Sequence, residues 1–345
     1  MNSLLESFNV ESIGYKGVVV RLKQMVGWLL VGLIGMSTAT LAAETPSFEQ
    51  WLAALKSEAL TKGISAQTLE RAFVGVAPIA RVVELDRKQP EFTRTLDQYL
   101  SNAISQRRID LGRQKLVENA ELLAQVYQKY GVPPHYLVAF WGIETDYGRF
   151  TGGNNVIAAL STLAYDGRRS AFFRSQLLDA LKIIEDGNIE PEKMLGSWAG
   201  AMGQAQFMPS TFRQYAIDFD GDGRIDLWNS KADVFASAAH YLSSVGWIDK
   251  QGWGREVQLP GEFDTKLFSL DIKKSLADWR AMGVSTLKVG DLPLADLEAS
   301  LVRPDDVDGA RAFLVYDNFH TILNWNRSSR YAIAVGTLAD ELSRP

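Results

Sequence analysis

One glutamate of the chain lies where acid–base chemistry would be favoured. Glu144 ends a segment, Tyr136 to Ile143, that is apolar at nearly every position, and Trp141 and Tyr147 flank it. Burial beside aromatic rings raises the pKa of a carboxyl group, so that the group stays protonated near neutral pH. Such an acid can protonate a poor leaving group, for example a glycosidic oxygen, as its bond breaks. Locally, a buried structural glutamate explains the pattern equally well.

A second carboxylate is used by most glycosidases, and Asp146 is the nearest candidate. The two carboxyl groups lie about 5 Å apart in retaining enzymes and about 6.5–9.5 Å apart in inverting ones. Residues two positions apart on a helix do not face each other, so Asp146 could serve only if the helix has already ended. A surface residue or a helix cap is the better interpretation of Asp146. The local residues therefore predict one acid, whose reaction needs another source of nucleophile.

The stretch from Gly196 to Ser210 also has residues that could bind a ligand. It is rich in glycine and alanine, which allow a ligand or another backbone segment to approach closely. Ser197 and Gln206 offer neutral hydrogen-bonding groups, and the residues after Gln206 form an apolar wall. Such a lining suits an N-acetyl sugar, although tight helix packing uses small residues in the same way.

An acidic loop that begins at Asp218 resembles an EF-hand calcium loop. Oxygen side chains occupy loop positions 1, 3, 5 and 9 and glycine occupies position 6; these residues are Asp218, Asp220, Asp222, Asp226 and Gly223. Arg224 lies at position 7, where EF-hand loops supply a backbone carbonyl. Position 12 departs from the pattern, because Asn229 replaces the bidentate glutamate. We expect Ca²⁺, or alternatively Na⁺, as a structural ion in preference to an empty acidic turn.

Helical patterns dominate the chain and must position these residues. Apolar residues recur at helical spacing between 47 and 132, where Ser47 and Gln50 predict a capping box. Gly131 and the prolines after it end one helix and start the next. Helical periodicity resumes over 156–163, 172–185, 232–242 and 331–342. Short alternating runs between about 255 and 313 predict strands around a helix near 276–282. The expected fold is mainly α with a small mixed α/β insertion.

Composition and the N-terminal segment narrow the classes of function. The net charge of −5 argues against a nucleic-acid partner, because phosphate binding requires a basic surface. A basic flank, an apolar run from Met25 to Met36 and an alanine-rich exit predict a cleavable signal peptide over residues 1–43, with a membrane anchor as the alternative. The run is shorter than the ~20 residues of a membrane-spanning helix. Without cysteine, the chain has no thiol nucleophile and no cysteine-linked lipid anchor.

Several of these motifs, in one consistent order, resemble the membrane-bound lytic murein transglycosylase B family (glycoside hydrolase family 103). The matching stretches are Gly142 to Thr145, Tyr147-Gly148, Asp166 to Arg169, Gly196 to Ser210 and Asn324 to Asn326. The resemblance covers the chain from about Ser47 onward. It implies a lysozyme-like helical body over residues 44–254 that includes the calcium-type loop at 218–233. An insertion over 255–318 and a closing segment over 319–345, which completes the catalytic cleft, would follow.

The resemblance also implies a mechanism and a set of ligand-binding residues. One glutamate, matching Glu144, acts first as acid and then as base on the bond between N-acetylmuramic acid and N-acetylglucosamine. The muramoyl C6 hydroxyl is the nucleophile, a 1,6-anhydro sugar forms, and no cofactor is needed. The positions that match sugar-binding residues are Ser197, Gln206, Arg168, Arg169, Trp325, Asn326 and Tyr331. Trp325 replaces the family's usual tyrosine, and Asp233 is implied to close the metal site.

We therefore expect a periplasmic lytic transglycosylase that acts on peptidoglycan as a monomer, peripheral to the wall rather than lipid-anchored. Two alternatives stay open. A lysozyme-type hydrolase would cleave the same bond with a water activated by Asp146. A non-catalytic, calcium-dependent peptidoglycan-binding protein would use Glu144 only as a structural residue.

Overall fold

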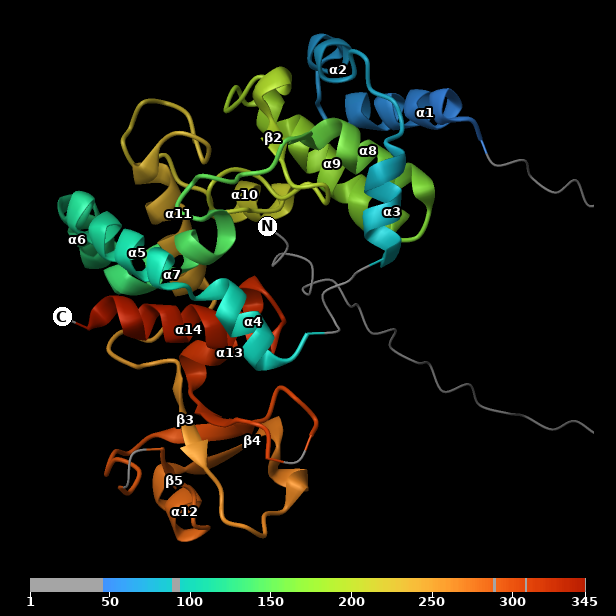
Figure 1. The fold of residues 1–345 in the computed structure, drawn as a ribbon. Coiled ribbons are helices and arrows are strands. Elements are labelled where there is room, and N and C mark those ends of the chain that lie inside the picture. The colour runs from blue at the N-terminus through green and yellow to red at the C-terminus, as the bar shows by residue number, and fades with distance from the viewer. Residues whose placement is uncertain (1–45, 89–93, 288–289, 308, 345) are drawn as a thin grey trace, which may run out of the picture.

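The computed structural model describes residues 46–88, 94–287, 290–307 and 309–344. Helices make up most of the described chain, and a smaller region with strands and one short helix lies at one end of the molecule (Figure 1). The predicted mainly α fold with a small mixed α/β part is confirmed. The predicted signal peptide lies outside the described residues. Within the described part, no helix is both long and apolar enough to cross a bilayer.

The N-terminal part of the described chain is helical, as predicted. Its helices are α1 (Phe48–Thr61), α2 (Ala66–Ala72), α3 (Ala80–Lys88), α4 (Leu96–Ala103), α5 (Gln106–Glu118) and α6 (Ala120–Tyr130). Helix α1 begins at the expected capping box, in which Ser47 and Gln50 each bond the other's backbone N–H. Gly131 ends α6 with a left-handed φ of 69°, a conformation that glycine adopts without steric cost.

The remaining helices carry most of the candidate site. They are α7 (Pro134–Thr145), α8 (Val156–Asp166), α9 (Ser170–Glu185), α10 (Pro209–Tyr215), α11 (Lys231–Ser244), α12 (Leu276–Ala281), α13 (Asp317–Trp325) and α14 (Ser329–Ser343). Two short 3₁₀ helices, η3 (Pro191–Lys193) and η4 (Thr265–Leu267), complete the set among the described residues.

Helix α7 lies inside the helical part of the molecule. It packs against α14, α5, α6 and α11, and every residue from Tyr136 to Thr145 is buried. A helix that is apolar on all sides must be covered on all sides, which explains this central position. Glu144 is carried into the core because it lies in the last turn of this helix.

Two antiparallel sheets are present among the described residues. In the first, β1 (Asn154–Asn155) pairs with β2 (Leu195–Gly196). The second has the strand order β4-β6-β7-β3-β5. Its strands are β3 (Gly254–Gln258), β4 (Ser269–Ser275), β5 (Ser285–Thr286), β6 (Glu298–Val302) and β7 (Ala312–Val315). These strands and α12 fall where alternating runs and a short helix were predicted.

Strand β7 contributes to two separate apolar cores. Phe313 and Val315 belong to the large core of the helices, whereas Ala312 and Leu314 belong to a smaller core that includes Trp279 of α12. Successive side chains of a strand point to opposite faces, so a strand buried on both faces can serve both cores. The four residues of β7 are accordingly all buried.

Candidate active site

Glu144 is buried near the end of α7, with 7% of its surface exposed. Its two carboxyl oxygens have different surroundings. Oε1 accepts hydrogen bonds from the Trp325 indole N–H at 2.8 Å and from the Tyr331 hydroxyl at 2.5 Å. Oε2 is buried and has no hydrogen-bond partner in the described part of the chain. Glu144 also lines a small, mostly apolar cavity together with Phe140 and Ala205.

The protonation of Glu144 follows from this burial. Burial raises the pKa of Glu144 from 4.5 to about 8, and the hydrogen bonds from Tyr331 and Trp325 lower it by less than burial raises it. The carboxyl group is therefore protonated near neutral pH. A buried acid that keeps its proton at this pH can deliver it to a bound leaving group.

Trp325 and Tyr331 reach Glu144 from the end of α13 and the first turn of α14. Ser328 caps α14, because its hydroxyl accepts the backbone N–H of Tyr331 at 3.3 Å. Helix α14 packs directly on α7, which brings the fully buried Tyr331 against Glu144. Burial and the neighbouring Glu144 raise the pKa of Tyr331 well above its ordinary value, so its hydroxyl keeps its proton.

Asp146 caps the C-terminal end of α7 but does not lie on the surface. It has a left-handed φ of 51° and is 6% exposed. Arg107 donates to both of its carboxylate oxygens, at 2.6 and 2.7 Å, and Arg108 donates at 3.4 Å. The Arg149 Nε lies 3.8 Å away. The expectation of a cap is confirmed and that of a surface residue is wrong. The carboxylate is committed to arginines, and no hydrogen bond joins it to Glu144 among the described residues.

Gln204 connects the glycine-rich segment, Gly196 to Ser210, to α7 through hydrogen bonds, a role that the sequence did not reveal. Its side-chain carbonyl accepts the Trp141 indole N–H at 2.9 Å, and its amide donates to the Trp228 carbonyl at 2.7 Å. Its backbone carbonyl accepts the Thr145 hydroxyl at 3.0 Å. Gln204 also lines the cavity beside Glu144. The sequence pattern contains this glutamine, but no local feature distinguishes it from Gln206.

Three of the expected sugar-binding residues hydrogen-bond backbone groups, and one of these bonds joins two segments, because the Gln206 amide donates to the Thr151 carbonyl. The Ser197 hydroxyl accepts a backbone N–H at 3.0 Å, and the Gln206 amide donates to two backbone carbonyls at 2.8 and 2.9 Å. Asn326 is buried, and its side-chain oxygen accepts the backbone N–H of Ser328 at 3.0 Å. Of the expected ligand residues, Trp325 and Tyr331 are the ones that hydrogen-bond Glu144.

Arg168 and Arg169 are held together by Asp86 of α3, which is 1% exposed. Arg168 donates to Asp86 through Nε at 2.5 Å and through Nη2 at 2.9 Å, and Arg169 forms a short ion pair with the same carboxylate. Burial alone would raise the pKa of Asp86, but the two guanidinium groups lower it below its ordinary value. The cluster keeps a net positive charge, and 43% of the Arg168 side chain is exposed. Sequence reasoning missed Asp86, because nothing near it in the chain marks it as a partner of residues 82 and 83 positions away.

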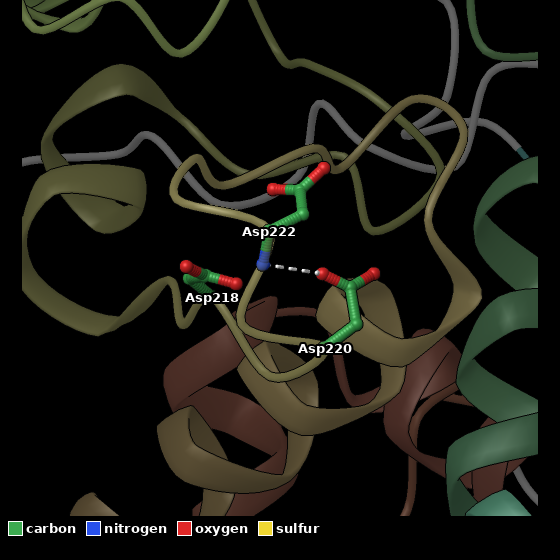
Figure 2. A group of neighbouring side chains, drawn as sticks. All are labelled: Asp218, Asp220 and Asp222. Carbon is green, nitrogen blue, oxygen red and sulfur yellow. Dashed lines mark hydrogen bonds between the residues drawn. The ribbon is translucent and has the colours of Figure 1, made fainter.

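The acidic loop brings three carboxylates close to one another, as Figure 2 shows. One oxygen from each of Asp218, Asp220 and Asp222 lies within 4.8 Å of the others. Asp218 accepts two backbone N–H groups of the loop, at 2.7 and 3.0 Å, and Gly223 has a left-handed φ of 94°. Three close hard oxygens on a tight, glycine-bent loop fit a calcium-type ion.

Asp233 and Asn229 have other contacts in this loop. The fully buried Asp233 accepts the backbone N–H groups of Phe219 at 2.8 Å and Asp226 at 2.7 Å, which ties both sides of the loop to α11. Asn229, at loop position 12, donates to Asp226 at 3.0 Å. Asp233 therefore holds the backbone of the loop in place. Among the described residues, the three clustered aspartates are best placed to bind an ion.

A helical body whose central helix carries a buried, protonated glutamate is what a lysozyme-like lytic enzyme requires, and comparison with known families gives the same class. The family model described as Transglycosylase SLT domain matches residues 47–340. The chain belongs to this family, and the predicted resemblance to lytic transglycosylases is confirmed.

Individual relatives make the placement more specific. Membrane-bound lytic murein transglycosylase B of Escherichia coli K12 is 36% identical over 230 residues, which cover 65% of this chain and 60% of that protein. The crystal structure of SltB3 from Pseudomonas aeruginosa in complex with NAG-anhNAM-pentapeptide is 50% identical, with a TM-score of 0.83, over 86% of this chain and 79% of that one. The Escherichia coli lytic transglycosylase Slt35 in complex with calcium is 30% identical, with a TM-score of 0.73, over 87% of this chain and 94% of that one. The lysozyme-like fold is thereby established.

Proposed function

We propose that this protein is a lytic transglycosylase that cleaves the β-1,4 bond between N-acetylmuramic acid and N-acetylglucosamine in peptidoglycan. Family membership and the likeness to SltB3, whose solved complex holds a NAG-anhNAM-pentapeptide, support the substrate class. The observation that carries the reaction type is the state of the two acidic groups. Glu144 is buried and protonated near neutral pH, whereas Asp146 is committed to arginines.

In the proposed reaction Glu144 acts twice. Its neutral carboxyl group gives a proton to the glycosidic oxygen, and the bond to the anomeric carbon breaks. The resulting carboxylate takes the proton of the muramoyl C6 hydroxyl as that oxygen bonds to the anomeric carbon. Glu144 returns to its starting state, no water is consumed, and a 1,6-anhydro end forms. A single acid is sufficient, because the substrate contains its own nucleophile.

The contacts with the substrate are part of the proposal. We assign sugar and peptide binding to Ser197, Gln206, Arg168, Arg169, Trp325, Asn326 and Tyr331. The two arginines carry more positive charge than Asp86 neutralises, which suits the carboxylates of a lactyl group or stem peptide. We propose that the chain divides into a helical body over 44–254, an insertion over 255–318 and a closing segment over 319–345.

We further propose a structural Ca²⁺ and a periplasmic location. Asp218, Asp220 and Asp222, with the carbonyl of Arg224 and support from Asp233, would hold the ion. It would neutralise close negative charges and take no part in catalysis; the Slt35 complex with calcium supports this assignment. Action on peptidoglycan as a monomer peripheral to the wall would place the mature enzyme in the periplasm.

The products distinguish the proposal from its alternatives. Mass spectrometry of digested sacculi should find muropeptides lighter by one water than the corresponding hydrolysis products. Glu144→Gln should lower the rate by about 10²–10⁴-fold, because the side chain can no longer transfer a proton. Retained binding of the variant to sacculi would separate loss of chemistry from loss of affinity. Products with only reducing ends would instead identify a hydrolase, and cleavage unaffected by Glu144→Gln would exclude this mechanism altogether.

Asp146→Asn provides the second test. If Asp146 activated a water, the variant would lose cleavage as fully as Glu144→Gln. We expect a lower stability, by about 1–3 kcal/mol, because the arginines lose a buried charged partner. Once folded, the variant should still yield anhydro products. Urea unfolding and product analysis on the same preparation measure both effects.

A further inference from the structure

The two carboxyl oxygens of Glu144 have different hydrogen-bond partners, and the two donors to Oε1 differ in their chemistry. Oε1 receives the Trp325 indole N–H and the Tyr331 hydroxyl, whereas Oε2 receives no hydrogen bond from the described residues. A tyrosine hydroxyl can donate or accept. An indole N–H can only donate, and it does not titrate in the range where the protein is folded. Trp325 therefore requires an acceptor at Oε1 at every pH.

The indole cannot easily turn away from Glu144. Three aromatic rings surround it, with ring centroids of Phe140 at 4.6 Å, Tyr241 at 5.2 Å and Phe207 at 5.3 Å. They come from α7, α11 and the glycine-rich segment. The Tyr241 hydroxyl also donates to the Asn324 carbonyl at 2.7 Å, which fixes the backbone next to Trp325. Residues from several elements thus fix the orientation of the Trp325 indole.

A constant donor at Oε1 determines where the proton of the neutral acid resides. The carbonyl oxygen of a carboxylic acid is a better acceptor than its hydroxyl oxygen, and two lone pairs allow it to receive both donors. With Oε1 as the carbonyl oxygen, the O–H lies on Oε2. Glu144 lines the cavity, and among the described residues no side chain or backbone group hydrogen-bonds its Oε2.

We propose that Trp325 is a positioning residue that anchors Oε1 of Glu144, so that Oε2 is the oxygen that exchanges protons with the substrate. This proposal rests on the acid–base function assigned to Glu144 above. The O–H of Oε2 protonates the leaving oxygen, and the same oxygen, once negative, takes back the C6 hydroxyl proton. The indole N–H stabilises the intervening carboxylate, because a hydrogen bond to a charged acceptor is stronger than one to a neutral acceptor.

The test is the pH dependence of kcat/KM for Trp325→Phe and Trp325→Tyr on purified glycan strands. The acid form of Glu144 is needed to start the reaction, so activity falls as pH rises through its pKa. Removal of the donor in Trp325→Phe favours the neutral form, and we expect the alkaline limb to move to higher pH by about one unit. Trp325→Tyr keeps an aromatic ring with a donor and should leave the limb near its wild-type position.

Trp279→Phe is the matched control. Trp279 is also buried and donates its indole N–H, to the Ala299 carbonyl at 2.9 Å, but it lies in the smaller core. The substitution removes the same chemical group without touching Glu144, and the alkaline limb should stay in place. Circular dichroism of each variant verifies its fold. A uniform loss of rate in Trp325→Phe, with the limb unmoved, would overturn the proposal and leave Trp325 a packing residue.

A second readout separates failure of this inference from failure of the proposed function. Infrared difference spectra across a pH titration, with Glu144→Gln as the blank, report the protonation of Glu144 in the free protein. We expect its titration to shift upward in Trp325→Phe and not in Trp279→Phe. An unshifted titration would contradict the inference even if the enzyme makes anhydro products. Hydrolytic products with a shifted titration would contradict the proposed function while the anchoring role stands.

Discussion

At the scale of single residues, opposing effects set the state of Glu144. Burial favours the neutral carboxyl group, whereas the Trp325 and Tyr331 hydrogen bonds favour the carboxylate. Burial is the larger effect, and the resulting pKa of about 8 allows one group to give and regain a proton near neutral pH. A stronger set of donors would produce a permanent carboxylate that cannot protonate a leaving group. Complete removal of the donors would raise the pKa further and produce an acid that gives its proton to a leaving group less readily.

The raised pKa of Glu144 also predicts how stability depends on pH. Between its ordinary pKa of 4.5 and about 8, the folded protein holds a proton that the unfolded chain releases. The free energy of unfolding should therefore fall as pH rises through this window, by up to about 1.4 kcal/mol per pH unit from this group. Glu144→Gln removes the contribution.

Urea unfolding of both proteins at pH 5 and pH 9 measures this effect. The stability of Glu144→Gln relative to wild type should increase by a few kcal/mol from pH 5 to pH 9. An equal difference between the two proteins at both values would show that burial does not hold the proton on Glu144.

At the scale of elements, close contact between α14 and the segment before β3 supports the site. Gly336 of α14 faces Trp253, whose indole N–H donates to Asp340 of the same helix at 3.0 Å. The Trp253 ring also lies about as near to Phe319 of α13 as to Phe313 of β7, with ring centroids 6.2 and 6.1 Å away. Because α14 carries Tyr331, this packing contributes to the position of a donor to Glu144.

Gly336→Ala should test how closely these elements are packed. A Cβ at this position would lie 2.3 Å from the Trp253 ring, which its neighbours hold in place. Overpacking costs about 1–3 kcal/mol, and we expect a net destabilisation even though alanine favours a helix by about 1 kcal/mol over glycine. Gly252→Ala is the control, since a Cβ there meets no atom within 4 Å. Equal urea unfolding midpoints for the two variants would argue against tight packing at α14.

Local signals explain which elements the sequence could predict. The apolar run of α7, the capping box at Ser47 and the left-handed Gly131 depend on residues a few positions apart, and these features were foreseen. The hydrogen bonds of Glu144 come from residues 181 and 187 positions later, and no spacing rule predicts such pairs. The burial of Asp146 was missed for the same reason, because its partner Arg107 lies 39 positions earlier on another helix.

At the scale of the whole molecule, the acidic loop concentrates negative charge at one place. The three clustered aspartates lie on an exposed loop between α10 and α11, and the Arg224 Nε lies 3.5 Å from an Asp222 oxygen. Asp233 of α11 accepts backbone hydrogen bonds from both ends of this loop. Close like charges destabilise the folded state unless a counter-ion compensates them. The loop is therefore the place where an added ion should change global stability.

Removal of calcium should lower the thermal stability of the protein. At a free Ca²⁺ concentration about 100-fold above Kd, a site present only in the folded state contributes about 2.7 kcal/mol. EDTA should therefore lower Tm, and Ca²⁺ should restore it. Asp220→Asn should abolish this dependence, whereas Asp291→Asn, at an exposed position outside the cluster, should retain it. A Tm that is equal with EDTA and with Ca²⁺ would exclude a stabilising ion.

The sharing of β7 between two cores limits how modular this protein can be. Phe313 and Val315 fill the body while Ala312 and Leu314 fill the smaller core, within four consecutive residues. Excision of the strand region as a cassette would leave a hole in the body, and transplanting it would expose two large apolar side chains. A chimaera between two relatives would have to keep β7 together with the helical body that it packs against, or exchange β7 together with both of the cores that its two faces fill. Strand β7 therefore belongs to both cores, and cutting the chain beside it does not separate two independent parts.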